Sequence, residues 1–389
     1  MKIAIYAPAN LHDLARFCGQ TTEGVPPGLG STATTPLVVE LLRRGHEITL
    51  FTLSHSLAKE TTYNWGALRL FVGAAREYGA SRNFYRPEIT YLCRVISQDR
   101  PSFVHAHWTY EFALGALATG IPTVTTIHDL PWNVLRYFRD RSRVIRLLMA
   151  YSVAMRCQRY TAVSEDAAIH FRRYLRPGAE ITVIPNFLSD SIFEIGKSAL
   201  IPTRPLTFGT ILQGWSKRKN ATAALKAFQA VVRIASEARL IMIGSGYEKE
   251  GPAHRWARRH NLDAGVTFVG LLPYEQMLRT VLDDVDVIVH PSLDEAFSMT
   301  VLESMALAKP VIAGNDTPGI RDALRCGDAG ILADVRDSRS IAHAMISLMA
   351  DSSYRQHVAQ SGHQHVASTY RKDFIVPQYE AVYRSMPHQ

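Results

Sequence analysis

Cysteine and long apolar runs are both scarce in this sequence. The four cysteines, Cys18, Cys93, Cys157 and Cys326, lie far apart and form no C-x-x-C pair, which argues against a zinc site and against a disulfide framework. No apolar run approaches the roughly 18 residues that a membrane-spanning helix needs, and no long apolar region follows the first strand. We therefore expect a protein of the reducing cytosol that neither spans a membrane nor carries a secretion signal.

Acidic residues are outnumbered by basic ones, 35 against 43, so the net charge is +8 and the pI about 9.3. Net charge bears on partners rather than on fold, and it leaves nucleic acid, anionic lipid and a phosphorylated substrate open. The hydrophobic content of 47% and the charged content of 20% are those of a globular protein. A length of 389 residues suits two domains.

Strand and helix patterns alternate along both halves of the chain. KIAIYAP is typical of an apolar strand, and a loop with Gly and Pro follows it; PLVVELLRRG from Pro36 predicts an amphipathic helix, and residues 47–52 a second strand. This βαβ order favours a parallel α/β sheet. Residues 84–98 predict a helix, and the polar, Pro-containing residues 194–205 a linker between two domains.

The stretch around residues 285–310 carries the strongest local signal. Apolar Val285–Val289 predicts a short buried strand that Pro291 ends, and Met299–Ala308 has apolar residues at helical spacing. Glu295 lies in the intervening turn and Glu303 along the helix, so the helix begins between two carboxylates. An isolated pair at this spacing is most often a turn residue and a solvated helix residue. The sequence motifs around this pair decide between that interpretation and a binding site.

The start of this helix is a candidate anion site. The backbone N–H groups of Ser298, Met299 and Thr300 have no carbonyl of a preceding turn to bind, and together with the helix dipole they favour a phosphate. The side chain of Ser298 or Thr300 is suited to cap this end.

Glu295-Ala-Phe-Ser-Met-Thr-Val-Leu-Glu303 resembles the E-x7-E signature of retaining glycosyltransferases of the sucrose-synthase-like family four, also called "glycosyl transferases group 1". The resemblance implies the GT-B fold: two Rossmann-like α/β domains with a cleft between them, and a C-terminal helix that crosses back to the N-terminal domain. On this basis we expect an acceptor-side domain at 1–193, a linker at 194–205, a nucleotide-sugar-binding domain at 206–368 and the returning helix at 369–389, with Tyr370, Phe374, Tyr379 and Tyr383 packing on the first domain.

The resemblance implies roles for residues of the second domain. Glu303 would bind the ribose hydroxyls, the amides of Ser298, Met299 and Thr300 the diphosphate, and Glu295 hydroxyls of the transferred sugar. Lys219 would neutralise the departing diphosphate, with Arg218 or Lys217 in place of the family's usual arginine. The backbone of Gly270, Leu271 and Leu272 would pack on the nucleobase. Two positions depart from the family pattern: Ser298 stands where Gly is usual, and Gln213 where an arginine is usual.

In the first domain the candidates are Gly30 and His128. A lone G-x-G such as Gly28-Leu29-Gly30 is weak support for phosphate binding, but the family has a glycine-rich loop here that faces the donor. A histidine at a strand end is most often structural, whereas the T-x-H-D motif implies that His128 contacts the donor sugar. We expect His105 and His107 to point to opposite faces of their strand and not to share a metal ion.

We therefore predict a retaining, metal-independent hexosyltransferase with no cofactor, using a UDP- or GDP-linked sugar and a glycan or lipid-linked glycan acceptor of bacterial cell-surface polysaccharide synthesis. Front-face attack is the implied mechanism. The alternatives are a GT-B epimerase or hydrolase acting on the nucleotide sugar alone, and a catalytically silent binding subunit. The acidic residues Asp283, Asp284 and Asp286 are interpreted as a helix end and strand entry and not as a metal motif.

Residues 131–160 form an unusually basic segment with apolar neighbours. Arg136, Arg139, Arg143 and Arg146 are candidates for a membrane or acceptor-side contact, because such a mixture suits an anionic bilayer surface. A solvated helix face is the alternative, and no motif for reading nucleic acid accompanies the charge. We expect a cytoplasmic enzyme with peripheral contact to the inner face of the membrane.

Overall fold

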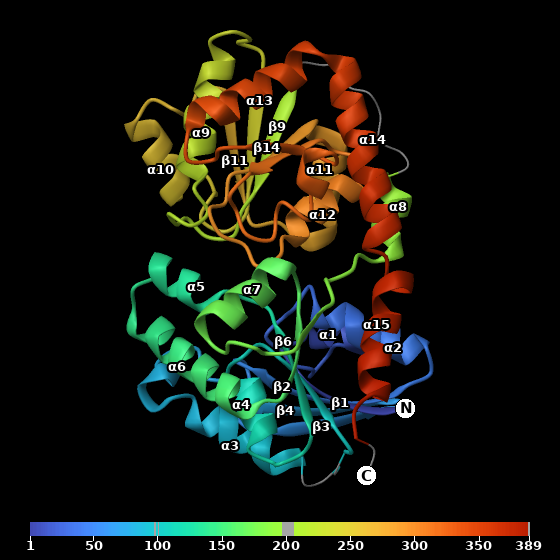
Figure 1. Ribbon diagram of the computed structural model, residues 1–389. Coiled ribbons are helices and arrows are strands. Elements are labelled where there is room, and N and C mark those ends of the chain that lie inside the picture. The colour runs from blue at the N-terminus through green and yellow to red at the C-terminus, as the bar shows by residue number, and fades with distance from the viewer. Residues whose placement is uncertain (97–98, 100, 197–205, 388–389) are drawn as a thin grey trace. The chain divides into compact units, whose positions relative to one another are not determined.

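The computed structural model describes residues 1–96, 99, 101–196 and 206–387, and these residues form two compact units. The first unit combines Met1–Phe187 with Lys372–Gln389, and the second is the continuous segment Leu188–Arg371 (Figure 1). Each unit is an α/β structure built on one sheet. The predicted fold class, including a C-terminal helix that joins the N-terminal domain, is confirmed.

The first unit alternates strands and helices from its first residues. Its elements are β1 (Lys2–Tyr6), α1 (Leu11–Phe17), α2 (Thr34–Arg43), β2 (Glu47–Ser54), β3 (Thr61–Trp65), β4 (Leu68–Ala74), the 3-10 helix η1 (Ala80–Asn83), α3 (Arg86–Val95), β5 (Val104–His107), α4 (Glu111–Leu117), β6 (Thr123–Ile127), α5 (Pro131–Tyr137), α6 (Arg141–Arg156), β7 (Arg159–Ala162), α7 (Glu165–Tyr174), β8 (Ile181–Val183) and the C-terminal α15 (Lys372–Arg384). The strand order in the described sheet is β3-β4-β2-β1-β5-β6-β7-β8. All neighbouring strands are parallel except β3, which runs antiparallel to β4.

The second unit repeats the alternation. It contains α8 (Asp190–Gly196), β9 (Thr207–Ile211), α9 (Ala221–Val232), β10 (Arg239–Ile243), α10 (Pro252–Arg259), β11 (Val266–Gly270), α11 (Tyr274–Asp284), β12 (Val287–His290), α12 (Met299–Ala306), β13 (Val311–Gly314), the 3-10 helix η3 (Arg325–Gly327), β14 (Ile331–Ala333), α13 (Ser338–Ala350) and α14 (Ser352–Thr369). The strands pair in the order β11-β10-β9-β12-β13-β14, all parallel. Parallel strands are covered by helices on both faces, which is why β12 and β13 are buried along their whole length and, apart from His290, apolar.

Close backbone approach at the carboxyl ends of the second sheet requires glycine. Gly244 follows β10 with φ 126°, and a Cβ built on it would lie 1.8 Å from the carbonyl oxygen of Leu212. A side chain at this position would therefore push apart the turns that follow β9 and β10. These turns lie at the edge of the sheet where open parallel sheets bind ligands.

The helix α15 packs on α2 and completes the apolar core of the first unit. Tyr379 and Tyr383 are buried there, as expected. The expectation is wrong for Tyr370 and Phe374. Tyr370 ends α14 and packs in the core of the second unit, and Phe374 is 52% exposed because it lies on the outer side of α15.

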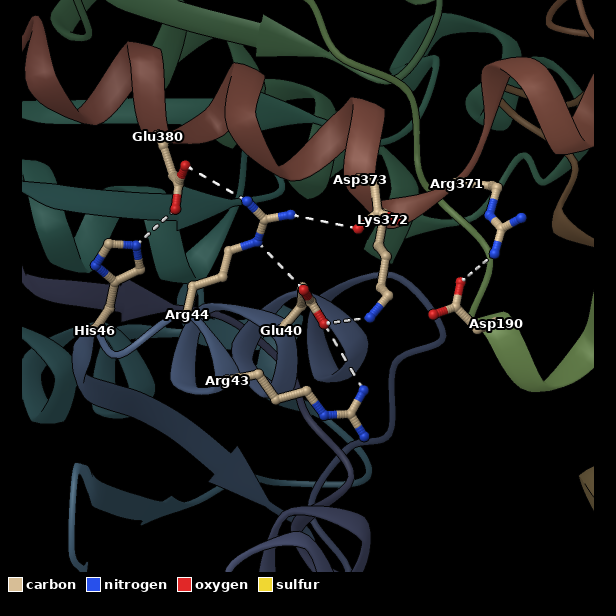
Figure 2. A network of polar contacts seen from close by, with 9 residues as sticks. All are labelled: Glu40, Arg43, Arg44, His46, Asp190, Arg371, Lys372, Asp373 and Glu380. Atoms are coloured by element: carbon tan, nitrogen blue, oxygen red, sulfur yellow. Dashed lines mark hydrogen bonds and ion pairs between the residues drawn. The ribbon is translucent and has the colours of Figure 1, made fainter.

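A polar network ties α15 to α2 beside this core (Figure 2). Lys372 donates to Glu40 at 3.3 Å, and Arg44 forms an ion pair with the same carboxylate at 3.2 Å. Glu380 accepts from His46 Nε2 at 2.8 Å. Because Glu40 is buried, these cations offset the cost of removing its charge from water.

Two domain boundaries differ from those expected from the sequence. The first unit ends at Phe187 instead of 193, because Ile192 and Phe193 of α8 pack in the core of the second unit. Residues 194–196 of the expected linker belong to α8, and residues 197–205 lie outside the described residues. The sequence analysis missed α1, β3, β4 and α4. Among the described residues, no helix combines the length and the apolar character needed to cross a membrane.

Candidate active site

The strand, turn and helix predicted around residues 285–310 are present as β12 and α12. The helix begins at Met299, and Ser298 is its N-cap, with the side-chain Oγ accepting from the N–H of Val301 at 3.4 Å. The N–H groups of Met299 and Thr300 belong to the first turn, where no intrahelical carbonyl is available to them. The positive end of α12 therefore points into the loop that carries Glu295.

Glu295 lies in a compact charged cluster with Lys219 and His290. Lys219 Nζ is 2.5 Å from Glu295 Oε1, and His290 Nε2 is 3.3 Å from the same oxygen. Burial opposes ionisation of the Glu295 carboxyl, but the ammonium of Lys219 and the contact with His290 outweigh it and hold the pKa well below its usual range. Glu295 is therefore a carboxylate at neutral pH. The structure thus brings together two predicted residues, Glu295 and Lys219, with one that the sequence analysis missed.

His290 is the last residue of β12, and its Nε2 also lies 3.4 Å from Ser298 Oγ. It links the carboxylate to the cap of α12. His128 was selected through the T-x-H-D motif and not through its place at a strand end. That place alone, at the edge of a parallel sheet where ligands bind, is the signal that could have pointed to His290.

Asn220 positions Lys219. It is the N-cap of α9 with φ 51°, and its side-chain amide donates to the carbonyl oxygens of Pro291 at 3.1 Å and Val335 at 2.7 Å. These hydrogen bonds hold the start of α9 against the end of β12. Asparagine tolerates the left-handed backbone conformation better than bulkier residues do. The ammonium of Lys219 is thereby directed to Glu295.

Arg218, the other predicted cation, forms an ion pair with a different carboxylate from the one that Lys219 contacts. Its Nη1 lies 3.9 Å from the carboxylate of Asp294, which is buried, and its carbonyl accepts from the N–H of Leu293 at 2.8 Å. Arg218 therefore holds the loop before Glu295. Its role toward a diphosphate stays a prediction.

Glu303 lies on α12 and is buried. Its carboxylate accepts a hydrogen bond from the Tyr274 hydroxyl at 2.9 Å. Burial raises the pKa of Glu303 to about 7, although the hydrogen bond from Tyr274 acts in the opposite direction. Burial is the larger of the two effects, so this carboxyl is about half protonated near pH 7. Tyr274 was not singled out from the sequence.

Gly270, Leu271 and Leu272 connect β11 to the segment that leads to Tyr274. Gly270 has φ 84°, Leu271 is 68% exposed, and Leu272 packs against the core of the second unit. The exposed Leu271 belongs to the same unit as Glu303. Its proposed contact with a base stays a prediction.

His128 follows β6 in the first unit and is surrounded by aromatic rings. Its Nε2 lies 2.8 Å from His107 Nδ1, and its ring stacks on Trp108 with centroids 4.1 Å apart. Burial lowers the pKa of His128 to about 3, so the ring is neutral at pH 7. Trp108 adopts φ 64°, which is rare for an aromatic residue and common at functional sites.

The expectation that His105 and His107 point to opposite faces is wrong. Residues two apart in a strand share a face, and the two rings lie 4.1 Å apart. His105 contacts the Tyr383 hydroxyl of α15 at 2.8 Å and Thr126 Oγ1 at 2.6 Å. Among the described residues, no group of three His, Cys, Asp or Glu side chains is arranged to hold a metal ion.

Gly30 lies in a loop that crosses the end of β1. Its N–H donates to the Ala9 carbonyl at 3.1 Å, and a Cβ on the neighbouring Gly28 would lie 2.2 Å from the same oxygen. Glycine is needed at 28 for this approach.

The four arginines predicted to face a membrane or the acceptor have different environments. Arg136 and Arg139 are exposed. Arg143 forms an ion pair with Asp140 at 3.2 Å, and Arg146 is held by Glu111 at 3.9 Å and by the ring of Tyr110, 4.8 Å from its centroid. Arg146 is therefore held by these contacts in place of standing free in solvent, and its predicted membrane or acceptor-side role stays a prediction.

Asp283 and Asp284 end α11, as interpreted from the sequence. Asp286 accepts from the N–H of Thr207 at 2.7 Å and joins the entries of β12 and β9. Asp286 thus binds backbone at the amino ends of the strands, at the opposite edge of the sheet from the cluster around Glu295.

Comparison with known proteins identifies the class. The model of "Glycosyltransferase Family 4" matches residues 31–191, and that of "Glycosyl transferases group 1" matches residues 209–365. Among solved structures, sucrose-phosphate synthase from Thermosynechococcus elongatus superposes with a TM-score of 0.74 at 16% identity, over 99% of this chain and 98% of that one. The fold is GT-B, and the protein is a glycosyltransferase.

The chain belongs to the GT4-like glycosyltransferases. Among curated relatives, N-acetyl-alpha-D-glucosaminyl L-malate synthase of Bacillus anthracis is 23% identical over 75% of this chain and 77% of that protein. A structure of Anabaena Alr3699/HepE in complex with UDP-glucose superposes with a TM-score of 0.68 at 16% identity, over 99% of this chain and 100% of that one.

Proposed function

We propose that this glycosyltransferase transfers a hexosyl group, with retention, from a nucleoside diphosphate sugar to a hydroxyl of a glycan intermediate in bacterial cell-surface polysaccharide synthesis. The observation that carries the proposal is the cluster of Lys219, Glu295 and His290 beside the N-terminus of α12. It combines a cation and a helix end for a diphosphate with an ionised carboxylate for sugar hydroxyls.

The reaction breaks the bond between the anomeric carbon and the diphosphate oxygen and forms a bond from that carbon to the acceptor oxygen. The acceptor's proton passes to the departing phosphate oxygen. Charge therefore grows on the diphosphate, where Lys219 and the N–H groups of Met299 and Thr300 stabilise it. Release of Lys219 from its contact with Glu295 frees that carboxylate to accept from sugar hydroxyls.

Metal independence is part of the proposal. Lys219, Arg218 and the helix end supply positive charge that a divalent cation supplies in other phosphoryl-leaving reactions. Asp286 is engaged by the backbone of Thr207, which supports a structural role for the acidic residues.

The donor is proposed to be UDP- or GDP-linked. Its ribose is held by Glu303, and its sugar by Glu295 and by His128, whose Nδ1 is the nitrogen not used in the contact with His107. The complexes of Anabaena Alr3699/HepE with UDP, UDP and glucose, and UDP-glucose support a uridine donor by analogy.

A donor screen tests the proposal. Thermal unfolding is followed with UDP-, GDP-, ADP- and dTDP-sugars, since a ligand at a hundredfold excess over its Kd adds about 2.7 kcal/mol of stability. The stabilising donor is then incubated with and without a glycan acceptor extract. Acceptor-dependent release of the nucleoside diphosphate, with the α-linkage of the donor kept in the product by NMR, is the expected result.

Acceptor-independent turnover would instead indicate the epimerase or hydrolase, and binding without turnover under every condition the silent subunit. Inversion of the linkage would contradict retention.

A peripheral membrane contact is proposed for the outer face of α5 and α6. Exposed apolar side chains lie there, namely Trp132 (40%), Val144 (44%), Leu148 (50%) and Met155 (78%), near the exposed Arg136 and Arg139. Apolar side chains flanked by arginines suit an anionic bilayer surface. This contact would bring a cytoplasmic enzyme to a lipid-linked acceptor.

A further inference from the structure

A cavity of about 370 Å³ lies wholly within the first unit. It is bounded by the carboxyl ends of β2 and β4, by the segment 75–85, and by the N-terminal turns of α4 and α6. The elements η1 and α4 both pack on α6, and Figure 1 shows α3, α4 and α6 grouped on one side of the sheet. The volume falls in the range of small-molecule sites, and the carboxyl ends of parallel strands are where such sites form.

The wall of the cavity is polar and strongly organised. Arg146 lies between two rings, 5.5 Å from the Tyr85 centroid and 4.8 Å from that of Tyr110, and its Nη2 is 3.9 Å from Glu111 Oε1. Arg76 binds Glu88 through two hydrogen bonds, at 2.9 Å and 2.7 Å. These guanidinium groups are fixed before any ligand arrives.

Glu111 supplies the observation that points to a ligand. It is the first residue of α4, lines the cavity, and is only 8% exposed. Its Oε2 has no hydrogen-bond partner among the residues that the structure describes. A buried carboxylate oxygen left unpaired costs free energy, so the site is incomplete without a donor.

The segment beside the cavity is strained. Phe84 and Tyr85 are consecutive aromatic residues with φ 58° and 56°, in the left-handed region that bulky side chains avoid. The strained backbone holds the Tyr85 hydroxyl 3.4 Å from Ser142 Oγ and from Arg146 Nε. Strain of this kind persists where surrounding contacts enforce it, and it concentrates at ligand sites.

The charges around the cavity select its ligand. Arg76, Arg143 and Arg146 line it, and each already faces a carboxylate: Glu88, Asp140 and Glu111. An anionic ligand would have to break one of these ion pairs. A hydroxyl group both donates and accepts, so a polyol can bind Glu111 Oε2 and the arginine forks without adding charge.

We propose that this cavity binds an uncharged sugar residue of the acceptor, with Glu111 Oε2 accepting from a hydroxyl and Tyr85 packing against the ring. The proposal rests on the proposed glycosyl transfer and names its acceptor as a neutral glycosyl group, in place of a phosphorylated or carboxylated one. Leu29, between Gly28 and Gly30, also lines the cavity. The acceptor pocket therefore shares a wall with the loop assigned to the donor.

Direct binding without any donor tests this inference. Saturation-transfer NMR is run on the full chain with the methyl glycosides of glucose, galactose, mannose and N-acetylglucosamine, and with the matching 6-phosphates and uronic acids. We expect saturable binding of at least one neutral glycoside, with its charged counterparts at least tenfold weaker.

Glu111→Gln should weaken that binding at least about tenfold, as loss of a hydrogen bond to a charged group does. Glu165→Gln is the matched control, because Glu165 is likewise the first residue of a helix of the first unit but is exposed; it should bind as the wild type. Ser142→Trp, which fills the cavity and keeps all its charges, should abolish binding.

Tighter binding of the phosphates or uronates would overturn the inference, as would a panel in which no neutral glycoside gives a signal that depends on Glu111. Affinity for the free nucleoside diphosphate, measured by calorimetry on the same variants, should not change. Because no donor is present in the binding assay, this outcome is independent of whether the glycosyl transfer itself is confirmed.

Discussion

Binding of the donor's nucleoside should depend on pH through Glu303. This carboxyl has a pKa of about 7 without ligand, because it is buried. The pKa is raised, so the protonated form dominates below pH 7 and the carboxylate above it. The ribose hydroxyls need acceptors, and the ionised carboxylate binds both of them better than the acid does. Affinity should therefore rise with pH and level off above about pH 8.

The size of the effect follows from the pKa. If the bound state keeps Glu303 ionised, the protons released on binding make Kd about 25-fold larger at pH 5.5 than at pH 7.5. The steepest dependence is about tenfold per pH unit, below pH 7. A group with an ordinary carboxyl pKa would give almost no change over this range.

Uridine and guanosine are the suitable probes, because a nucleoside carries no phosphate that titrates near pH 6. Calorimetry from pH 5.5 to 8.5 would measure the profile of the wild type and of Glu303→Gln, which should bind weakly and without pH dependence. A flat profile for the wild type, or affinity that falls as pH rises, would refute the reasoning.

Four further outcomes are expected. Glu303→Gln should raise the unfolding temperature at pH 8 while it weakens nucleotide binding, because a buried carboxyl whose pKa is raised from about 4.5 to about 7 costs on the order of 3 kcal/mol when ionised, a cost absent below pH 4.5; an unchanged or lower Tm contradicts this. Lys219→Ala should lower kcat by about 10²–10³ with a much smaller change in donor affinity, whereas Lys226→Ala, at an exposed lysine of α9, should leave kcat unchanged; equal losses in kcat and in donor affinity would contradict the role of Lys219. EDTA should leave the rate nearly unchanged, and full loss that Mg²⁺ or Mn²⁺ restores would reverse the assignment. Vesicle flotation should show binding that needs anionic lipid, weakens with salt and drops when Arg136 and Arg139 become Glu, and equal binding to neutral vesicles would exclude this surface.

Local pattern was enough to predict the strand, turn and helix that carry Glu295 and Glu303. The apolar run ends at a proline, and helical spacing resumes at Met299. Lys219 was predicted only through the resemblance, because nothing in a basic turn says which cation reaches a carboxylate that lies far away in the sequence. The ion pair between Lys219 and Glu295 is a product of the sheet order that sets β9 beside β12.

Residues whose role depends on a tertiary partner escaped prediction. Tyr274 matters because its hydroxyl reaches Glu303, and Glu111 because one oxygen of its carboxylate is buried without a partner among the described residues. The sequence also predicted more exposed arginines than the structure has, because Arg146 is held by Glu111 and by two tyrosine rings. Counting charges along a segment cannot separate paired from exposed guanidinium groups.

The route of the chain sets an order for folding during synthesis. The second unit is one continuous segment and can complete its core as soon as Arg371 has emerged. The first unit cannot, because the face that receives Tyr379 and Tyr383 stays uncovered, and His105 lacks its contact with the Tyr383 hydroxyl, until α15 has been made. His105 packs on His107, which contacts His128, so this chain of contacts is completed only when the last residues of the chain have been translated. A chain released before α15 has been made would therefore have a finished second unit and an unfinished first unit.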